Sequence, residues 1–161
     1  MPEVVYSELA ELKIPARDEY IGVAKRVATS LGGQLGFGLD EIDELAIAVV
    51  QACANVIETA EETWGDGATV KVTFSPTDRG LAVEVEAIAP NARDGLPVER
   101  VAPEIGPSPT RRLPPPTGAE LEEATRALAR DMIRLFVDDF RHQVDAGSRH
   151  IRYRMVKYLI S

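Results

Sequence analysis

Residues 45–57 constrain the fold of this chain more than any other segment. Small and branched apolar residues cover most of the circumference of a helix there, and only Gln51 and Asn55 interrupt them. A helix that is apolar on nearly every side has to be covered by other elements, and this one is too short to cross a bilayer. We therefore predict a buried central helix that begins with Asp40 as its N-cap.

The segment before this helix predicts a strand and a second helix. Residues 8–15 have the pattern of a short edge strand that a proline ends. Asp18 can cap the helix that follows, and we expect the glycines at 32–33 and 36–38 to break it. Its apolar stripe consists of Ile21, Ala24, Val27, Ala28 and Leu31.

The second half of the chain returns to strands. Alternation of apolar and polar residues predicts a β-hairpin from residues 69–74 and 81–87. We expect a third helix at 120–135, then two closing strands at 136–144 and 149–160. One face of the third helix carries Leu121, Ala124, Leu128, Met132 and Leu135. This order predicts an α+β fold, a two-layer α/β sandwich with a mixed, largely antiparallel sheet and helices on one face.

Residues 90–116 differ in composition from the rest of the chain. They hold most of its 11 prolines and show no sustained periodicity. We expect a mobile, proline-rich loop, and a loop of that length within a compact domain is usually functional. A length of 161 residues suits a single domain, residues 1–161.

Composition narrows the classes of partner and the compartment. The net charge of −8 disfavours nucleic acid or anionic membrane as the main partner, because their phosphates would be repelled. Cys53 is the single cysteine and lies in the apolar helix, so we expect an inert core thiol and no intramolecular disulfide. No secretory signal is evident at the start of the sequence. We expect a cytoplasmic protein.

Two segments carry a resemblance to a known family. Residues 13–23 (KIPARDEYIGV) and 39–55 (LDEIDELAIAVVQACAN) together resemble the anti-sigma-factor serine kinases, which belong to the GHKL, or Bergerat-fold, ATPases. The hairpin and the last strand are also similar, whereas residues 90–116 are only weakly so. The resemblance implies the same fold and a bacterial regulator of transcription in the stress response. It also implies two protein partners, a sigma factor and an anti-anti-sigma factor, and a homodimer.

The resemblance assigns roles to the two amides of the central helix. The family has a glutamate that acts as general base and, four residues later, an asparagine that holds the magnesium ion of the nucleotide. Asn55 matches the asparagine, and Gln51 stands where the glutamate would be. An amide is not basic near neutral pH, so Gln51 could orient a hydroxyl but not deprotonate it. Taken alone, both amides could instead hydrogen-bond a loop or a buried water.

Two further positions depart from the family pattern. Its adenine-binding aspartate and the glycine two residues later correspond to Ala87 and Ala89. Its glycine-rich phosphate loop is reduced to Gly118. We expect acidic residues to occupy the end of the third helix where a phosphate would lie, namely Glu120, Glu122 and Glu123. We therefore expect that the protein binds no nucleotide cofactor. If the site is functional instead, its ligand would be Mg-ATP.

These departures favour one function over two others. The leading hypothesis is an anti-sigma-factor-type binding protein with a degenerate nucleotide site, which acts by partner switching. By analogy with the family, its contact surface would include Arg17, Glu19, Tyr20 and Arg26. The alternative is an active ATP-dependent serine kinase that phosphorylates an anti-anti-sigma factor, which Asn55 favours and Gln51 and Ala87 oppose. The third hypothesis is a scaffold domain whose pocket holds no ligand.

Overall fold

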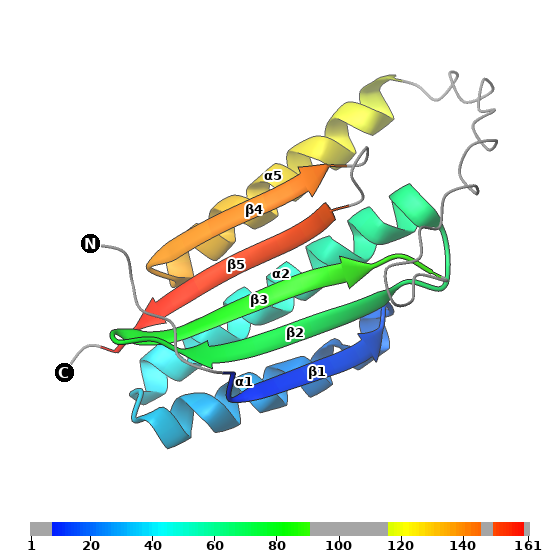
Figure 1. The fold of residues 1–161 in the computed structure, drawn as a ribbon. Coiled ribbons are helices and arrows are strands. Elements are labelled where there is room, and N and C mark those ends of the chain that lie inside the picture. The colour runs from blue at the N-terminus through cyan, green and yellow to red at the C-terminus, as the bar shows by residue number, and fades with distance from the viewer. Residues whose placement is uncertain (1–7, 91–115, 146–149, 160–161) are drawn as a thin grey trace.

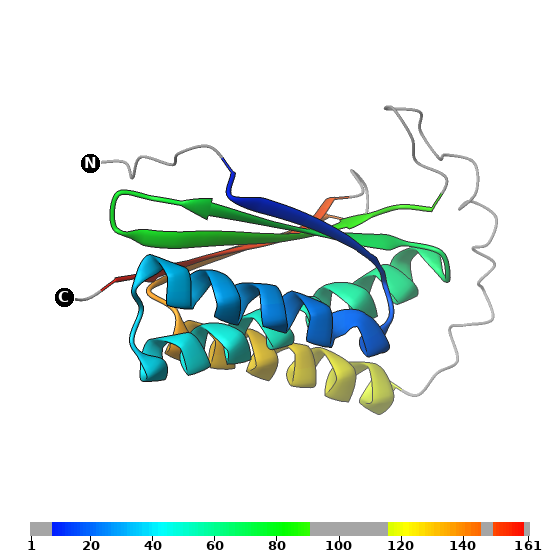
Figure 2. The same ribbon diagram turned by 90° about the horizontal axis from the view of Figure 1, so that it is seen from below.

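The computed structural model describes residues 8–90, 116–145 and 150–159 and shows two layers, a five-stranded sheet with helices on one face (Figures 1 and 2). This confirms the predicted two-layer α+β sandwich. The elements in chain order are β1 (Ala10–Pro15), the 3-10 turn η1 (Asp18–Tyr20), α1 (Ile21–Leu35), α2 (Leu39–Trp64), β2 (Thr69–Pro76), β3 (Gly80–Ile88), α5 (Pro116–Phe136), β4 (Asp139–Asp145) and β5 (His150–Tyr158).

The strands are ordered β1-β2-β3-β5-β4. We expected a mixed sheet, but every pair among the described strands is antiparallel. The register places Val72 opposite Val85 and Val83 opposite Met155, and all four are fully buried. Since side chains alternate between the faces of a sheet, this register turns one apolar face toward the helices and leaves charged residues on the other.

Helix α2 is the centre of the molecule, as predicted. It lies between α1 and α5 and packs on the sheet (Figure 2). Leu45, Val49 and Val56 are almost completely buried, and so is Cys53. Burial raises the pKa of the Cys53 thiol to about 12, which keeps it protonated and supports the prediction of an inert core residue.

The ends of α1 and α2 differ from the prediction. Asp18 lies in η1, and the N-cap of α1 is Tyr20. Gly32 does not break α1, which ends at Gly36 in the left-handed conformation (φ 93°). A Cβ on Gly32 would lie 3.2 Å from Ile42 Cγ1, so glycine allows α1 and α2 to pack closely there. The N-cap of α2 is Gly38 rather than Asp40, and the Gly38 N–H donates to Glu41 Oε1 at 2.8 Å.

Helix α5 begins at Pro116, before the predicted start at residue 120. Proline suits the first helical turn because its missing N–H would have no intrahelical partner. Ile133 of α5 is fully buried, whereas Leu121, Leu128 and Leu135 are mostly exposed. The apolar face recognised in the sequence is therefore turned to solvent. Of the predicted proline-rich loop, residues 91–115 lie outside the described residues.

Candidate functional site

Asn55 is the predicted site residue with the most unusual surroundings. It lies on the buried side of α2 and is only 5% exposed, and its main-chain carbonyl accepts a hydrogen bond from Thr59 Oγ1 at 2.8 Å. Its side-chain Nδ2 is buried without a hydrogen-bond partner among the described residues. Native proteins pair nearly all such groups, because an unpaired one costs about 1–3 kcal/mol. Asn55 therefore offers an amide to a ligand or water.

Gln51 lies one turn earlier on α2 but in different surroundings. It is partly exposed and lines a shallow groove of about 380 Å³ together with Lys25, Asp43 and Ile47. The groove runs between α1 and α2, and Asn55 does not line it. The two amides therefore share a helix but not one environment, because a spacing of four residues still rotates a side chain by about 40° around the helix axis.

Ala87 lies near the end of β3, opposite Val70 of β2. It is only 5% exposed and belongs to the hydrophobic core, on the same side of the strand as Val83 and Val85. Ala89 follows directly after the strand. The position that would carry an adenine-binding carboxylate thus holds a methyl group that packs in the core.

Gly118 lies inside the first turn of α5, and this corrects the prediction for the helix start. Because α5 begins at Pro116, its first turn contains no acidic residue. Glu120, Glu122 and Glu123 therefore follow the positive end of the helix instead of occupying it. Their predicted repulsion of a phosphate is weaker than expected, since the effect of a helix end falls off within the first turn.

Glu123 contributes to an ion-pair network that joins α5 to α2. Arg126 Nη1 lies 2.7 Å from Glu62 Oε2 and 3.8 Å from Glu58 Oε1, and Glu123 Oε2 accepts a hydrogen bond from Arg130 at 3.1 Å. The hydrogen bond from Arg130 and the charges of both arginines lower the pKa of Glu123. The sequence contained this signal, because Glu58/Glu62 and Arg126/Arg130 each recur with helical spacing.

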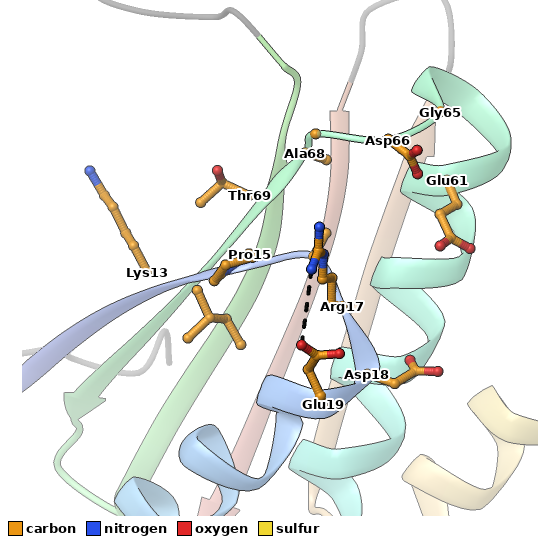
Figure 3. A pocket seen from close by; sticks show the side chains of 13 residues that line it. Lys13, Pro15, Arg17, Asp18, Glu19, Glu61, Gly65, Asp66, Ala68 and Thr69 are labelled. Carbon is orange, nitrogen blue, oxygen red and sulfur yellow. Dashed lines mark ion pairs between the residues drawn. The ribbon is translucent and has the colours of Figure 1, made fainter.

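A larger hollow lies where β1, η1 and the turn between α2 and β2 meet (Figure 3). Its volume is about 1000 Å³. Arg17 and Glu19, both predicted contact residues, line it and form an ion pair at 4.0 Å. Glu61 and Asp66 contribute carboxylates from the other side (Figure 3). The sequence does not reveal this hollow, because its walls come from segments far apart in the chain.

Residues 8–90, 116–145 and 150–159 contain neither a metal-binding cluster nor a membrane-spanning helix. No group of three or more His, Cys, Asp or Glu side chains is arranged there to hold a metal ion. In the same ranges no helix is both long and apolar enough to cross a membrane.

Comparison with known proteins places this fold in a family. The model for the histidine kinase-like ATPase domain matches residues 14–149. Proteins named serine-protein kinase RsbW are similar over most of the chain. The one from Bacillus licheniformis is 26% identical over 95% of this chain and 87% of its own length, and the one from Bacillus subtilis is 27% identical over the same shares.

A third relative with this name, from Bacillus velezensis, is 28% identical over 92% of this chain and 84% of its own length. The family model covers well over half of the chain, and it includes α1, α2 and the hairpin that carry the resemblance seen in the sequence. The chain therefore belongs to the family of histidine kinase-like ATPase domains.

Proposed function

We propose that this protein is an anti-sigma-factor-type regulatory binding protein whose nucleotide site is degenerate. In this proposal it acts by partner switching: it sequesters a sigma factor and is released when an anti-anti-sigma factor takes its place. The family assignment and the serine-protein kinase relatives support the regulatory role. The loss of catalysis rests on the residues of α2 and β3.

The observation that carries the proposal is the side chain at position 51. A kinase of this kind needs a base to take the proton of the attacking hydroxyl, and the amide of Gln51 cannot do so near neutral pH. A carboxylate one turn away could replace it. The neighbouring positions on the same face of α2 are instead Ile47, Ala48, Ala54 and Asn55.

The described residues also fit Mg-ATP poorly. Asn55 has an amide oxygen that could hold magnesium, whereas its unpaired Nδ2 is a hydrogen-bond donor and fits an acceptor such as a phosphate oxygen or a water. Ala87 does not fit adenine recognition, since it has no group that could accept the amino hydrogens. Gly118 lies within a helix instead of in a glycine-rich loop. We therefore expect nucleotide binding to be weak or absent and derive no chemical step from it.

Isothermal titration of the purified protein with Mg-ATP and Mg-ADP tests the degenerate site. We expect weak binding or none. A dissociation constant of about 1 µM or tighter corresponds to about 8 kcal/mol of binding free energy and would overturn this part of the proposal. The control is Asn55→Ala, which has to weaken any binding that occurs in the family's site.

The hollow shown in Figure 3 supports a contact surface for the partner. Arg17 and Glu19 lie at its wall, and Tyr20 and Arg26 follow on η1 and α1. Co-expression with each sigma factor of the same genome, without added nucleotide, should yield a stable complex with at least one. Arg26→Glu should weaken that complex, whereas Arg141→Glu, which changes an exposed residue on β4, should not. Capture of anti-anti-sigma proteins alone would contradict sigma-factor sequestration.

One observation favours the second candidate, an active serine kinase. The Nδ2 of Asn55 is a buried donor without a described partner, which is costly unless a bound ligand such as a nucleotide supplies an acceptor oxygen. Transfer of labelled phosphate from ATP to an anti-anti-sigma factor at a rate near one per second would establish the kinase. Absence of transfer together with sigma-factor binding would support the degenerate regulator.

A further inference from the structure

An aromatic cluster lies beside α5 at one edge of the sheet, where β4 pairs with β5 (Figure 1). The ring of Phe140 stacks on that of His142 with centroids 5.7 Å apart, and both rings contact Tyr153 of β5, at 5.4 and 5.8 Å. Tyr153 belongs to the core and is fully buried, whereas His142 is exposed. The three rings therefore connect the core to the surface.

Two arginines of α5 lie close to this cluster. The guanidinium carbon of Arg134 is 5.1 Å from the centre of the Phe140 ring, in a cation–π contact. Arg130 lies one turn earlier on the same side of the helix. Burial of the imidazole and the positive charges of both arginines lower the pKa of His142. At pH 7 His142 is therefore mostly neutral and lies near two permanent cations.

The hydroxyl of Tyr153 is the unexplained group of this cluster. Tyr153 interacts electrostatically with Arg130, yet its hydroxyl is buried and has no hydrogen-bond partner among the described residues. Native proteins pair nearly all such groups, because an unpaired one is costly to bury. A guanidinium group has no acceptor atom, so an acceptor for the hydroxyl proton has to come from elsewhere.

Among the described residues, only exposed carboxylates form ion pairs with these two arginines. Glu123 lies 3.1 Å from Arg130 and Asp131 lies 3.4 Å from Arg134, and the two acidic side chains are 60% and 71% exposed. Exposed ion pairs of this kind are weak, because water solvates both partners and salt screens their charges. A doubly charged anion can therefore replace the carboxylates while α5 stays in place.

We propose that a phosphate group, free or as a monoester, binds to the donors gathered here: Arg130, Arg134, His142 and the hydroxyl of Tyr153. A phosphate group carries up to two negative charges near pH 7 and at least three acceptor oxygens. It can accept hydrogen bonds from guanidinium, imidazole and hydroxyl groups at the same time. Arg130 has a long, flexible side chain that can turn aside and let a phosphate oxygen reach the Tyr153 hydroxyl.

This site is separate from the phosphate loop that the resemblance implies. Gly118, the remnant of that loop, lies twelve residues before Arg130 on α5, which is about 18 Å along the helix axis. The proposed site also contains no residue that suits a magnesium ion, since arginine is a donor only. The inference therefore does not depend on the proposed function.

Proton NMR of the histidine rings tests the site with inorganic phosphate as the probe, without magnesium. The chain has two histidines, and His150, three residues before Tyr153 on β5, serves as the internal reference. Phosphate at constant ionic strength should move the His142 signal to saturation and leave the His150 signal nearly unchanged. It should also raise the pKa of His142, because a bound anion favours the imidazolium form.

Two further ligands identify the source of the phosphate group. Glycerol 3-phosphate that binds as tightly as inorganic phosphate would identify a monoester as the ligand, and weaker binding would identify free phosphate. Acetate and chloride at the same ionic strength should have little effect on the His142 signal. An equal response to either of them, or no response to phosphate, would overturn the proposal.

Three variants distinguish binding at this site from a general effect of charge. Tyr153→Phe removes only the hydroxyl and Arg134→Gln removes one charge, and each should weaken phosphate binding at least about threefold. Tyr153→Phe should be no less stable, because its hydroxyl has no described partner to lose. The matched control is Arg141→Gln. Arg141 is 78% exposed and alternates with Phe140 and His142 along β4, so it faces the other side of the sheet.

The control should bind phosphate as the original protein does. If Arg141→Gln weakens binding as much as Arg134→Gln, phosphate responds only to net charge and the site does not exist. Unchanged binding in both Tyr153→Phe and Arg134→Gln would overturn the proposal as well.

Discussion

Lys157 Nζ lies 2.7 Å from Glu44 Oε1 and joins the last strand to the central helix. The lysine side chain is only 8% exposed and also donates to the carbonyl oxygen of Phe136 at 3.0 Å, whereas Glu44 is 42% exposed. A buried ammonium needs such partners because desolvation of a charge is costly. One side chain thus connects β5, α2 and the end of α5.

Removal of the two partners of this ion pair should have unequal effects. Glu44→Ala leaves a buried ammonium with the Phe136 carbonyl as acceptor and should lower the free energy of unfolding by about 1–2 kcal/mol. This is less than for a fully buried pair, because water reaches Glu44. Lys157→Met replaces the charge with an apolar side chain of similar volume and should change stability by less than about 1 kcal/mol. Urea unfolding of both variants measures the difference, and the reverse order would contradict it.

Gly80 should not tolerate a side chain. A Cβ there would lie 1.9 Å from the Lys157 carbonyl oxygen, where β3 pairs with the end of β5. Since the obstacle is main chain, it cannot move aside as a side chain could. Gly80→Ala should lower stability by about 3 kcal/mol or more. Gly33→Ala in α1 is the control, because its Cβ would meet nothing within 4 Å. This substitution should stabilise the protein by about 0.5–1 kcal/mol. Thermal melting of both variants checks this.

Gln51→Glu should not create a kinase. It supplies a proton acceptor, but Ala87 still offers no group to adenine, and residues of one site lose activity non-additively. Because Gln51 is partly exposed and shares a groove with Lys25, the new carboxylate should change stability by no more than about 0.5 kcal/mol. The measurement is transfer of labelled phosphate to an anti-anti-sigma factor. A rate near one per second would mean that only the base had been lost.

Asn55→Leu should be at least as stable as the original protein. The change removes a buried amide whose Nδ2 has no described partner and keeps the branched shape of the side chain, whereas the hydrogen bond from Thr59 goes to the main chain and persists. We expect a gain of up to about 1 kcal/mol. Chemical unfolding with and without Mg-ATP checks this. A loss of more than about 1 kcal/mol would show that the amide is satisfied in solution.

The stability contributed by the ion-pair network between α2 and α5 should depend on pH. Arg130 and Arg126 lower the pKa of Glu123 in the folded protein, while the unfolded chain keeps a value of about 4.3. The stabilisation that the Glu123 carboxylate contributes is fully present at pH values above its pKa in the unfolded chain. This stabilisation is lost as the pH falls through the pKa of Glu123 in the folded protein, because the unfolded state then binds more protons. Glu123→Gln should remove this dependence. The two proteins should differ in free energy of unfolding by less than about 1 kcal/mol, because the ion pair is exposed, and this difference should vanish in acid.

Sequence periodicity alone determined most of the secondary structure. The alternation in β2 and β3 and the apolar circumference of α2 both depend on residues close in the chain, so their spacing is sufficient evidence. The ends of helices were less certain. Gly32 was expected to break α1, but a glycine that allows α1 and α2 to pack closely cannot be distinguished in sequence from one that ends a helix.

Tertiary structure decided which side of each helix is buried. The leucines of α5 predicted an apolar face, yet the buried side is the one with Ile133 and the ion-paired Arg126, because Glu58 and Glu62 of α2 stand opposite it. In the same way, Gln51 and Asn55 are equivalent amides in the sequence. Only the packing of α1, α2 and the sheet leaves one in a groove and buries the other, since local spacing carries no information about distant neighbours.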